Sequence, residues 1–210
     1  MLPRMDKRYP NLEKAKAFAL GFTNMAYCYD SIAHSEFMEV TCPECKREIQ
    51  KTDYLYPKAS FHKPTHRLDS LDYGVSEELR NELIRLFDIT PEDFRPIRTK
   101  KGEIVFYQIT PQHAIAPLHE ENGWTVDCDC PVCGYVRYSR QHELRNSRKE
   151  PYFHITQEAL AGMKDLNITF ERFRFDMPIW IISRRLYDYL IHRFPNTHYY
   201  PFFLKEDLEA

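Results

Sequence analysis

Four cysteines form two short pairs of the same form, Cys42-Pro43-Glu44-Cys45 and Cys130-Pro131-Val132-Cys133, separated by residues 46–129. A two-residue spacer lets both sulfurs of a pair face one ion, and four thiolates suit the tetrahedral preference of Zn²⁺. Proline after the first cysteine fixes φ and removes an N–H that would need a partner. The spacing therefore predicts a shared structural zinc, with the ligands Cys42, Cys45, Cys130 and Cys133.

Two further cysteines leave alternatives open. Cys128 precedes Cys130 by two residues and could compete with it for one coordination position. We assign Cys130, because the turn that ends in Gly134 matches the first pair better. Cys28 lies among apolar and aromatic residues, where a free cysteine usually acts as a small buried hydrophobe. The pairs could also be a redox dithiol, or a degenerate site that holds no metal.

Composition limits the class of protein. The chain has 210 residues, 43% of them hydrophobic, so it can bury an ordinary core and is expected to form one domain over residues 1–210. Its net charge of −2 gives no overall field for nucleic acid or an anionic membrane. No apolar stretch approaches ~18 residues, and no signal-peptide core precedes the first strand. These features predict a cytoplasmic protein without a membrane partner, where paired cysteines more often hold metal than form disulfides.

The elements that must position the cysteines are expected to form an α+β fold. Capping residues followed by apolar residues at helical spacing predict helices at 77–87, 157–163 and 184–194. Apolar and aromatic runs predict strands at 17–29, 36–40 and 103–109, and a final aromatic segment at 199–204 is expected to pack back on the domain. A mixed or antiparallel sheet with several short helices should then carry a zinc-ribbon-like excursion, built from residues of about 36–50 and 122–140.

Two weaker patterns give further expectations. Thr90-Pro91-Glu92-Asp93 has proline at the first helical position and acids in the first turn, which predicts another helix start. Residues 169–175 alternate partly between polar and aromatic side chains, which predicts a strand.

A basic segment follows the second cysteine pair. Arginine and aromatic residues interleaved in this way can contact phosphates and stack on bases, so nucleic-acid binding is one interpretation. A solvated face balanced by acids elsewhere is the other, and the acidic balance of the chain favours it. The basic residues of this segment, 137–149, are Arg137, Arg140, His142, Arg145, Arg148 and Lys149.

Catalytic motifs are not evident, and we predict that the protein is not an enzyme. His119-Glu120-Glu121 ahead of the second cysteine pair superficially resembles the zinc deaminase signature. The order of proline and cysteine is wrong, however, and the gap is too short for the helix and strand that carry those ligands. A four-cysteine site is also closed, whereas a catalytic zinc normally keeps an open position.

The cysteine pairs resemble those of the double-CXXCG motif proteins, a bacterial group associated with polymorphic toxin systems. Looser points of resemblance are residues 88–94 (Asp-Ile-Thr-Pro-Glu-Asp-Phe) and 181–188 (Ile-Ile-Ser-Arg-Arg-Leu-Tyr-Asp), so that the likeness spans roughly residues 36–204. Gly134 follows the second pair as the family pattern requires, but Lys46 stands where the first glycine is expected.

The resemblance implies an immunity protein that binds and neutralises a cognate protein toxin on a scaffold stabilised by structural zinc. Such an inhibitor works by surface complementarity, often with acidic groups opposite a basic cleft. The alternative from the residues is a zinc-ribbon nucleic-acid-binding or regulatory protein that uses the basic segment 137–149.

Overall fold

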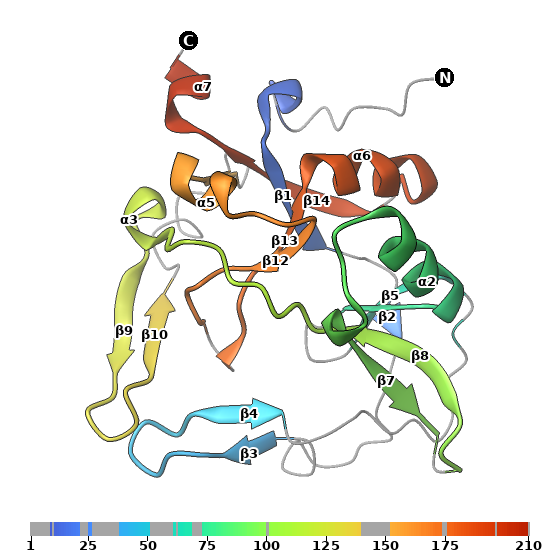
Figure 1. The fold of residues 1–210 in the computed structure, drawn as a ribbon. Coiled ribbons are helices and arrows are strands. Elements are labelled where there is room, and N and C mark those ends of the chain that lie inside the picture. The colour runs from blue at the N-terminus through green and yellow to red at the C-terminus, as the bar shows by residue number, and fades with distance from the viewer. Residues whose placement is uncertain are drawn as a thin grey trace.

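A computed structural model describes residues 9, 11–21, 25–26, 38–50, 61, 63–68, 73–99, 101–139, 152–173, 176–195 and 197–209. These residues form two five-stranded sheets, two separate two-stranded sheets and several short helices (Figure 1). The predicted α+β fold with mixed sheets is therefore confirmed. None of the described helices is long and apolar enough to cross a membrane.

The first five-stranded sheet has the strand order β11-β14-β1-β13-β12. In β1 the chain pairs antiparallel with both β13 and β14, whereas β11 runs parallel to β14. The sheet is therefore mixed, and the N-terminal strand lies at its centre. Its strands are β1 (Ala17–Gly21), β11 (Phe153–His154), β12 (Leu166–Ile168), β13 (Trp180–Ser183) and β14 (His198–Phe203).

Both faces of this sheet are buried, and β1 shows why. Successive side chains of a strand point to opposite faces, so Phe18 and Leu20 enter one hydrophobic cluster while Ala17 and Ala19 enter the other. On the first face Phe18 stacks on Tyr187 with ring centroids 3.5 Å apart. This explains why the strand is a continuous apolar run rather than an alternating one.

The second five-stranded sheet has the order β2-β5-β6-β8-β7. Its strands are β2 (Met25–Ala26), β5 (Thr65–Leu68), β6 (Tyr73–Val75), β7 (Phe94–Arg98) and β8 (Ile104–Ile109). Gly74 in β6 faces the Phe106 ring so closely that a Cβ there would lie 2.9 Å from it. This contact leaves no room for a side chain.

Helices cover the first sheet. Its two hydrophobic clusters include Leu186 and Leu190 from α6 on one side and Ala159 from α5 on the other. The helices are α2 (Glu77–Leu86), α3 (His119–Asn122), α5 (Gln157–Ala161), α6 (Arg184–Arg193) and α7 (Lys205–Glu209), with single 3₁₀ turns at η1 (Leu12–Lys14) and η2 (Pro91–Asp93).

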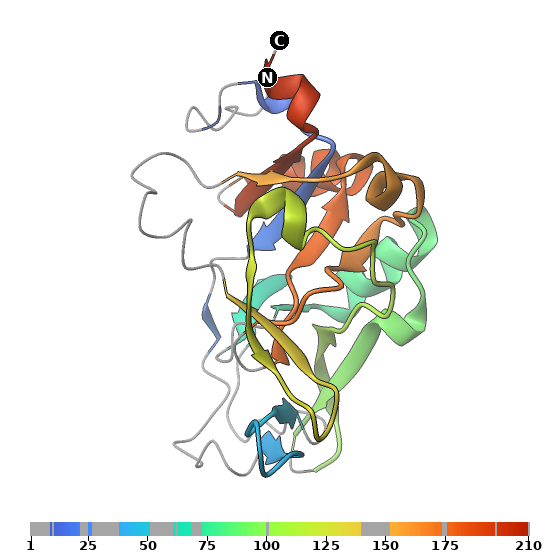
Figure 2. The same ribbon diagram turned by 90° about the vertical axis from the view of Figure 1, so that its left-hand side faces the viewer.

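Two hairpins stand apart from both large sheets. One pairs β3 (Met38–Val40) with β4 (Glu48–Gln50), and the other pairs β9 (Thr125–Asp129) with β10 (Val136–Ser139). Both views of the ribbon show their tips meeting at the end of the molecule opposite α7 (Figures 1 and 2). They are the two excursions that the sequence predicted.

The three predicted helices form with shorter bounds, and the side chains of Ser76, Thr156 and Ser183 cap them as expected. The helix start predicted at Thr90 is present, but as the single 3₁₀ turn η2, because its capping box closes at Asp93 and β7 begins at Phe94. This short turn leaves the chain free to enter the second sheet.

A strand at residues 169–175 was also predicted, and the described part, residues 169–173, contains only an isolated bridge from Phe173 to Met177. The Thr169 hydroxyl instead donates to the Glu171 carbonyl at 3.0 Å and accepts from the Ile179 N–H at 3.0 Å. These local hydrogen bonds compete with a strand ladder.

Asp165 joins three parts of the fold. Its buried carboxylate accepts hydrogen bonds from the Asp88 N–H (2.8 Å), from the Ser183 hydroxyl that caps α6, and from Arg185. Burial alone would raise the pKa of Asp165, but the hydrogen bonds from Arg185, Ser183 and Asp88 outweigh it and lower that pKa. The ionised form is therefore the one that the fold favours.

We expect Asp165→Asn to lower the free energy of unfolding by about 2 kcal/mol at pH 7, because it removes charge-assisted hydrogen bonds to a buried group. The pKa of Asp165 is lower in the folded protein than in the unfolded chain. The difference in free energy of unfolding between the parent protein and Asp165→Asn should therefore be largest above pH ~4 and shrink as the pH falls through the folded pKa. Urea denaturation of both proteins between pH 3 and pH 7 measures it, and a pH-independent difference would contradict the role of the charge.

Candidate metal centre

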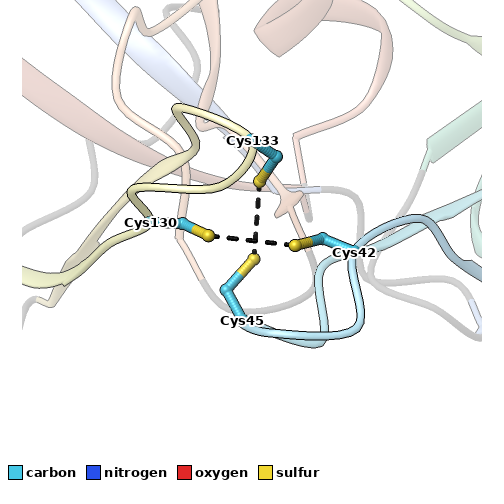
Figure 3. A group of neighbouring side chains, drawn as sticks. All are labelled: Cys42, Cys45, Cys130 and Cys133. Carbon is cyan, nitrogen blue, oxygen red and sulfur yellow. Dashed lines mark hydrogen bonds between the residues drawn. The ribbon is translucent and has the colours of Figure 1, made fainter.

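The tips of the two hairpins bring four cysteine sulfurs together. The Sγ atoms of Cys42, Cys45, Cys130 and Cys133 all lie within 4.8 Å of one another. Across the hairpins, Cys42 Sγ lies 3.8 Å from Cys130 Sγ, and Cys45 Sγ lies 3.7 Å from Cys133 Sγ. Figure 3 shows all four sulfurs directed at a common point. These separations are far longer than a disulfide bond of about 2.05 Å, and the thiols are free.

The two cysteine turns have the same backbone form. The Lys46 N–H donates to the Cys42 carbonyl at 3.0 Å, and the Gly134 N–H donates to the Cys130 carbonyl at 2.9 Å. Both donors have left-handed backbone, with φ of 55° at Lys46 and 68° at Gly134. Glycine adopts this conformation without cost, whereas a side chain makes it unfavourable by ~1 kcal/mol or more. Lys46 is therefore a strained position in an otherwise equivalent turn.

Backbone N–H groups of each turn point at its first sulfur. The N–H groups of Cys45 and Glu44 lower the pKa of Cys42 to about 7, and those of Cys133 and Val132 lower the pKa of Cys130. Hydrogen bonds to a thiolate favour the charged form, so the turns prepare one anionic ligand each.

The second sulfur of each turn behaves in the opposite way. Burial raises the pKa of Cys45 to about 12. The Tyr135 N–H lowers the pKa of Cys133, but desolvation and hydrogen bonds with neighbouring thiols together raise it. Four thiolates this close repel one another, so all four ionise together only when a cation lies among them. The arrangement therefore has the donor chemistry of a metal site.

Exposure differs across the cluster. Cys42 and Cys130 are each 2% exposed, Cys45 is half-buried and Cys133 is exposed. Cys42 and Cys130 pack with the buried ring of Tyr135 in a small hydrophobic cluster of their own. Four protein ligands would fill a tetrahedral shell, so the site is closed to a substrate even though solvent reaches one side of it.

Arg47 anchors the first hairpin beside the sulfurs. Its guanidinium lies 4.6 Å from the centre of the Tyr135 ring in the second hairpin, and it donates two hydrogen bonds, of 2.9 and 3.2 Å, to Asp176 Oδ2. The Tyr135 hydroxyl in turn donates to the Phe173 carbonyl at 3.4 Å. These contacts tie the hairpin tips to the segment that precedes β13.

The structure describes most of the residues that the sequence analysis proposed for a functional site. All four predicted ligands come together, and Cys128 is half-buried and packs against the same cluster without belonging to the group of four. Cys28 lies outside the described residues, as do residues 140–149 of the basic segment. Arg137, which is described, forms an ion pair with Asp127 at 2.8 Å.

The residues that resembled a deaminase signature serve another purpose. His119 lies at the start of α3, where its N–H and that of Leu118 donate to the fully buried carboxylate of Glu171 at 2.7 and 2.5 Å. His119 Nδ1 is 3.2 Å from the same oxygen. Glu171 thus caps a helix start, and His119 is not part of the cysteine group.

Sequence reasoning missed Arg47, Asp176 and Glu171. Arg47 offered a weak signal, since it follows the first cysteine pair and an arginine near thiolates would be attracted to them. Asp176 and Glu171 are distant in sequence from the groups that they bind, so no local pattern marks them.

We compared the chain with protein-family models, with curated proteins and with solved structures, and no match was found in any of the three comparisons.

The strained turn gives a direct prediction. We expect Lys46→Gly to raise the free energy of unfolding by about 0.5–1 kcal/mol, because it relieves the left-handed conformation of a residue with a side chain. Gly134→Lys, the matched change in the other turn, should lower it by a similar or larger amount. Urea denaturation of the two variants beside the parent protein tests both. If neither variant differs from the parent in its free energy of unfolding, the left-handed conformation does not cost what we expect in the two turns.

Proposed function

We propose that Cys42, Cys45, Cys130 and Cys133 hold a structural zinc ion. Thiolates bound to zinc at about 2.3 Å in a tetrahedron lie about 3.8 Å from one another. The two measured sulfur separations across the hairpins, 3.8 and 3.7 Å, agree with that value. A tetrahedral set of four thiolates suits zinc or iron among the common metals. Zinc is favoured because two such turns are typical of zinc ribbons and knuckles.

The zinc would act as a cross-link rather than as a catalyst. Each hairpin is a two-stranded sheet, and such a sheet is marginally stable at best on its own. The ion would join segments that are 88 residues apart in the chain and fix one tip against the other. The energy of metal binding would then contribute directly to folding of this end of the molecule.

We expect purified protein to contain one zinc per chain by mass spectrometry of the metal, and Cys42→Ser and Cys133→Ser each to lose it. Cys128→Ser is the matched control and should retain it. Removing the metal with a chelator should lower the thermal midpoint by several degrees, because a cross-link is lost. Iron in place of zinc, or full zinc content in Cys42→Ser and Cys133→Ser, would contradict the assignment.

We further propose that the protein is an immunity protein that binds and neutralises a cognate toxin without catalysing a reaction. The observation that carries this proposal is the matching backbone of the two turns, with left-handed residues at Lys46 and Gly134. These are the two positions where the double-CXXCG pattern has glycine, and left-handed backbone is the conformation that glycine favours, so the geometry at Lys46 and Gly134 supports the proposal despite the lysine.

The nature of the site supports a binding function. A site closed by four protein ligands serves to fix a scaffold and offers no coordination position to a substrate. Within the described ranges, this is the one group of His, Cys, Asp and Glu side chains with a metal-binding geometry. A rigid scaffold of this kind suits inhibition by surface complementarity, which depends on preorganisation more than on chemistry.

The test begins with the neighbouring reading frames: a large secreted protein with a C-terminal toxin-like domain encoded beside this chain would supply the candidate toxin, and its absence would favour the nucleic-acid-binding alternative. We expect expression of that toxin-like domain in a bacterial host to stop growth, and co-expression of the protein to restore growth through a stoichiometric complex that survives nuclease treatment. Cys133→Ser should protect poorly, because the hairpin tips are no longer cross-linked, and Cys128→Ser should protect fully.

Recovery of nucleic acid, or of many nuclease-sensitive proteins, in place of one protein partner would contradict the immunity proposal. The alternative of a zinc-ribbon nucleic-acid-binding or regulatory protein would then replace it. In that case Arg140→Ala, Arg145→Ala and Arg148→Ala together should weaken binding and flatten its salt dependence.

A further inference from the structure

The second hairpin carries a fifth thiol beside the four that converge. Cys128 is half-buried and packs against the cluster that contains Cys42, Cys130 and Tyr135. It lies in β9 opposite Arg137 of β10. Cys130 is the first residue after β9, and both Cys128 and Cys130 belong to or pack against the same small cluster with Tyr135. A spare sulfur therefore lies beside the proposed metal centre.

The spacing of this thiol allows it to act as a ligand. Cys128 and Cys133 are separated by four residues, and ligand pairs in zinc sites are separated by two to four. A shift of the strand by two residues keeps every side chain on its own face, whereas a shift by one would reverse them all. Cys128 can thus take the place of Cys130 without turning the hairpin over.

The hairpin is irregular at the place where such a shift would occur. The pairing of β9 with β10 changes register between Arg137, opposite Cys128, and Tyr138, opposite Val126. This leaves Asp127 as an extra residue, which is the pattern of a β-bulge, and bulges redirect side chains and interrupt the ladder. Cys130 keeps the preferred position because its turn is closed by two hydrogen bonds, from Cys130 N–H to Tyr135 (3.0 Å) and from Gly134 N–H to Cys130 (2.9 Å).

We propose that Cys128 is a reserve ligand of the metal centre, which binds the metal when Cys130 is released from it. The inference rests on the zinc centre proposed above. It assigns to the hairpin two alternative ligand sets that share Cys42, Cys45 and Cys133. Exchange between them would let the metal change partners by replacing one thiolate with another rather than by leaving an empty position.

The main experiment compares zinc content and affinity in Cys130→Ser, Cys133→Ser and the double variant Cys128→Ser/Cys130→Ser. Cys28→Ser provides the matched loss of a cysteine elsewhere. We expect Cys130→Ser to keep one zinc per chain with an affinity lower by about 10- to 100-fold, as for a distorted site. Cys133→Ser and the double variant should both lose the metal.

Alkylation with iodoacetamide gives an independent readout. In zinc-loaded wild-type protein Cys128 should be modified while the four ligands are protected. In zinc-loaded Cys130→Ser, Cys128 should itself become protected, and peptide mass spectrometry locates the modification. Circular dichroism checks that Cys130→Ser is folded. A folded Cys130→Ser protein with no more zinc than Cys133→Ser would overturn the proposal.

A second measurement tests the proposal if Cys130→Ser does not fold. The rate of zinc transfer to a chromophoric chelator should be several-fold slower in Cys128→Ser than in the wild type, with the equilibrium affinity for zinc unchanged. Equal transfer rates would then overturn the inference while leaving the zinc centre intact. Wild-type protein that binds no zinc would instead overturn the zinc centre, and the reserve ligand with it.

Discussion

The close approach of four cysteine sulfurs is the constraint on which this end of the molecule depends, because four thiolates at this distance would repel one another. The Sγ atoms lie within 4.8 Å of one another, and Cys42 and Cys130 are almost completely buried. The turns oppose that repulsion in part, by directing backbone N–H groups at the first sulfur of each pair. They leave the second sulfur of each pair protonated, as the raised pKa values of Cys45 and Cys133 indicate. A divalent cation bound among the four sulfurs would favour the thiolate form of all of them.

The rest of the hairpin region follows from that centre. Neither two-stranded sheet joins a larger sheet, so each depends on contacts made by its tip and by a few side chains. Arg47 supplies two of these, since it lies against Tyr135 and also pairs with Asp176, which precedes β13 of the first five-stranded sheet. A cation beside thiolates also offsets the excess negative charge that four thiolates keep around a divalent ion. Arg47 and Tyr135 therefore tie the hairpins to the core, and the proposed metal would add a cross-link between the two tips.

The sequence predicted those features that depend on local chemistry. Spacing and proline placement identified the four cysteines that converge, and capping serines and threonines marked where helices begin. Prediction was weaker where distant contacts decide the structure. The extended run from Ala17 was recognised as a strand, but not its place at the centre of a sheet whose other strands come from residues 153–203. Thr90 marked a helix start but not the length of the helix, because a capping box has the same composition whether one turn or several follow it. Residues 169–173 turn inward because Glu171 caps α3, a partner that lies 52 residues away.

Lys46 shows how a departure from a sequence pattern can be consistent with the same structure. A glycine after the second cysteine is favoured because that residue must adopt left-handed backbone and donate its N–H to the carbonyl of the first cysteine. Lys46 meets both requirements, with φ of 55° and a hydrogen bond of 3.0 Å to Cys42. The cost of ~1 kcal/mol is small beside the free energy of zinc binding, which is ~10 kcal/mol or more in small structural zinc sites. A turn closed by metal can therefore tolerate a residue that a free hairpin would exclude. The pattern that matters at this position is the backbone conformation, and glycine is the commonest way to reach it.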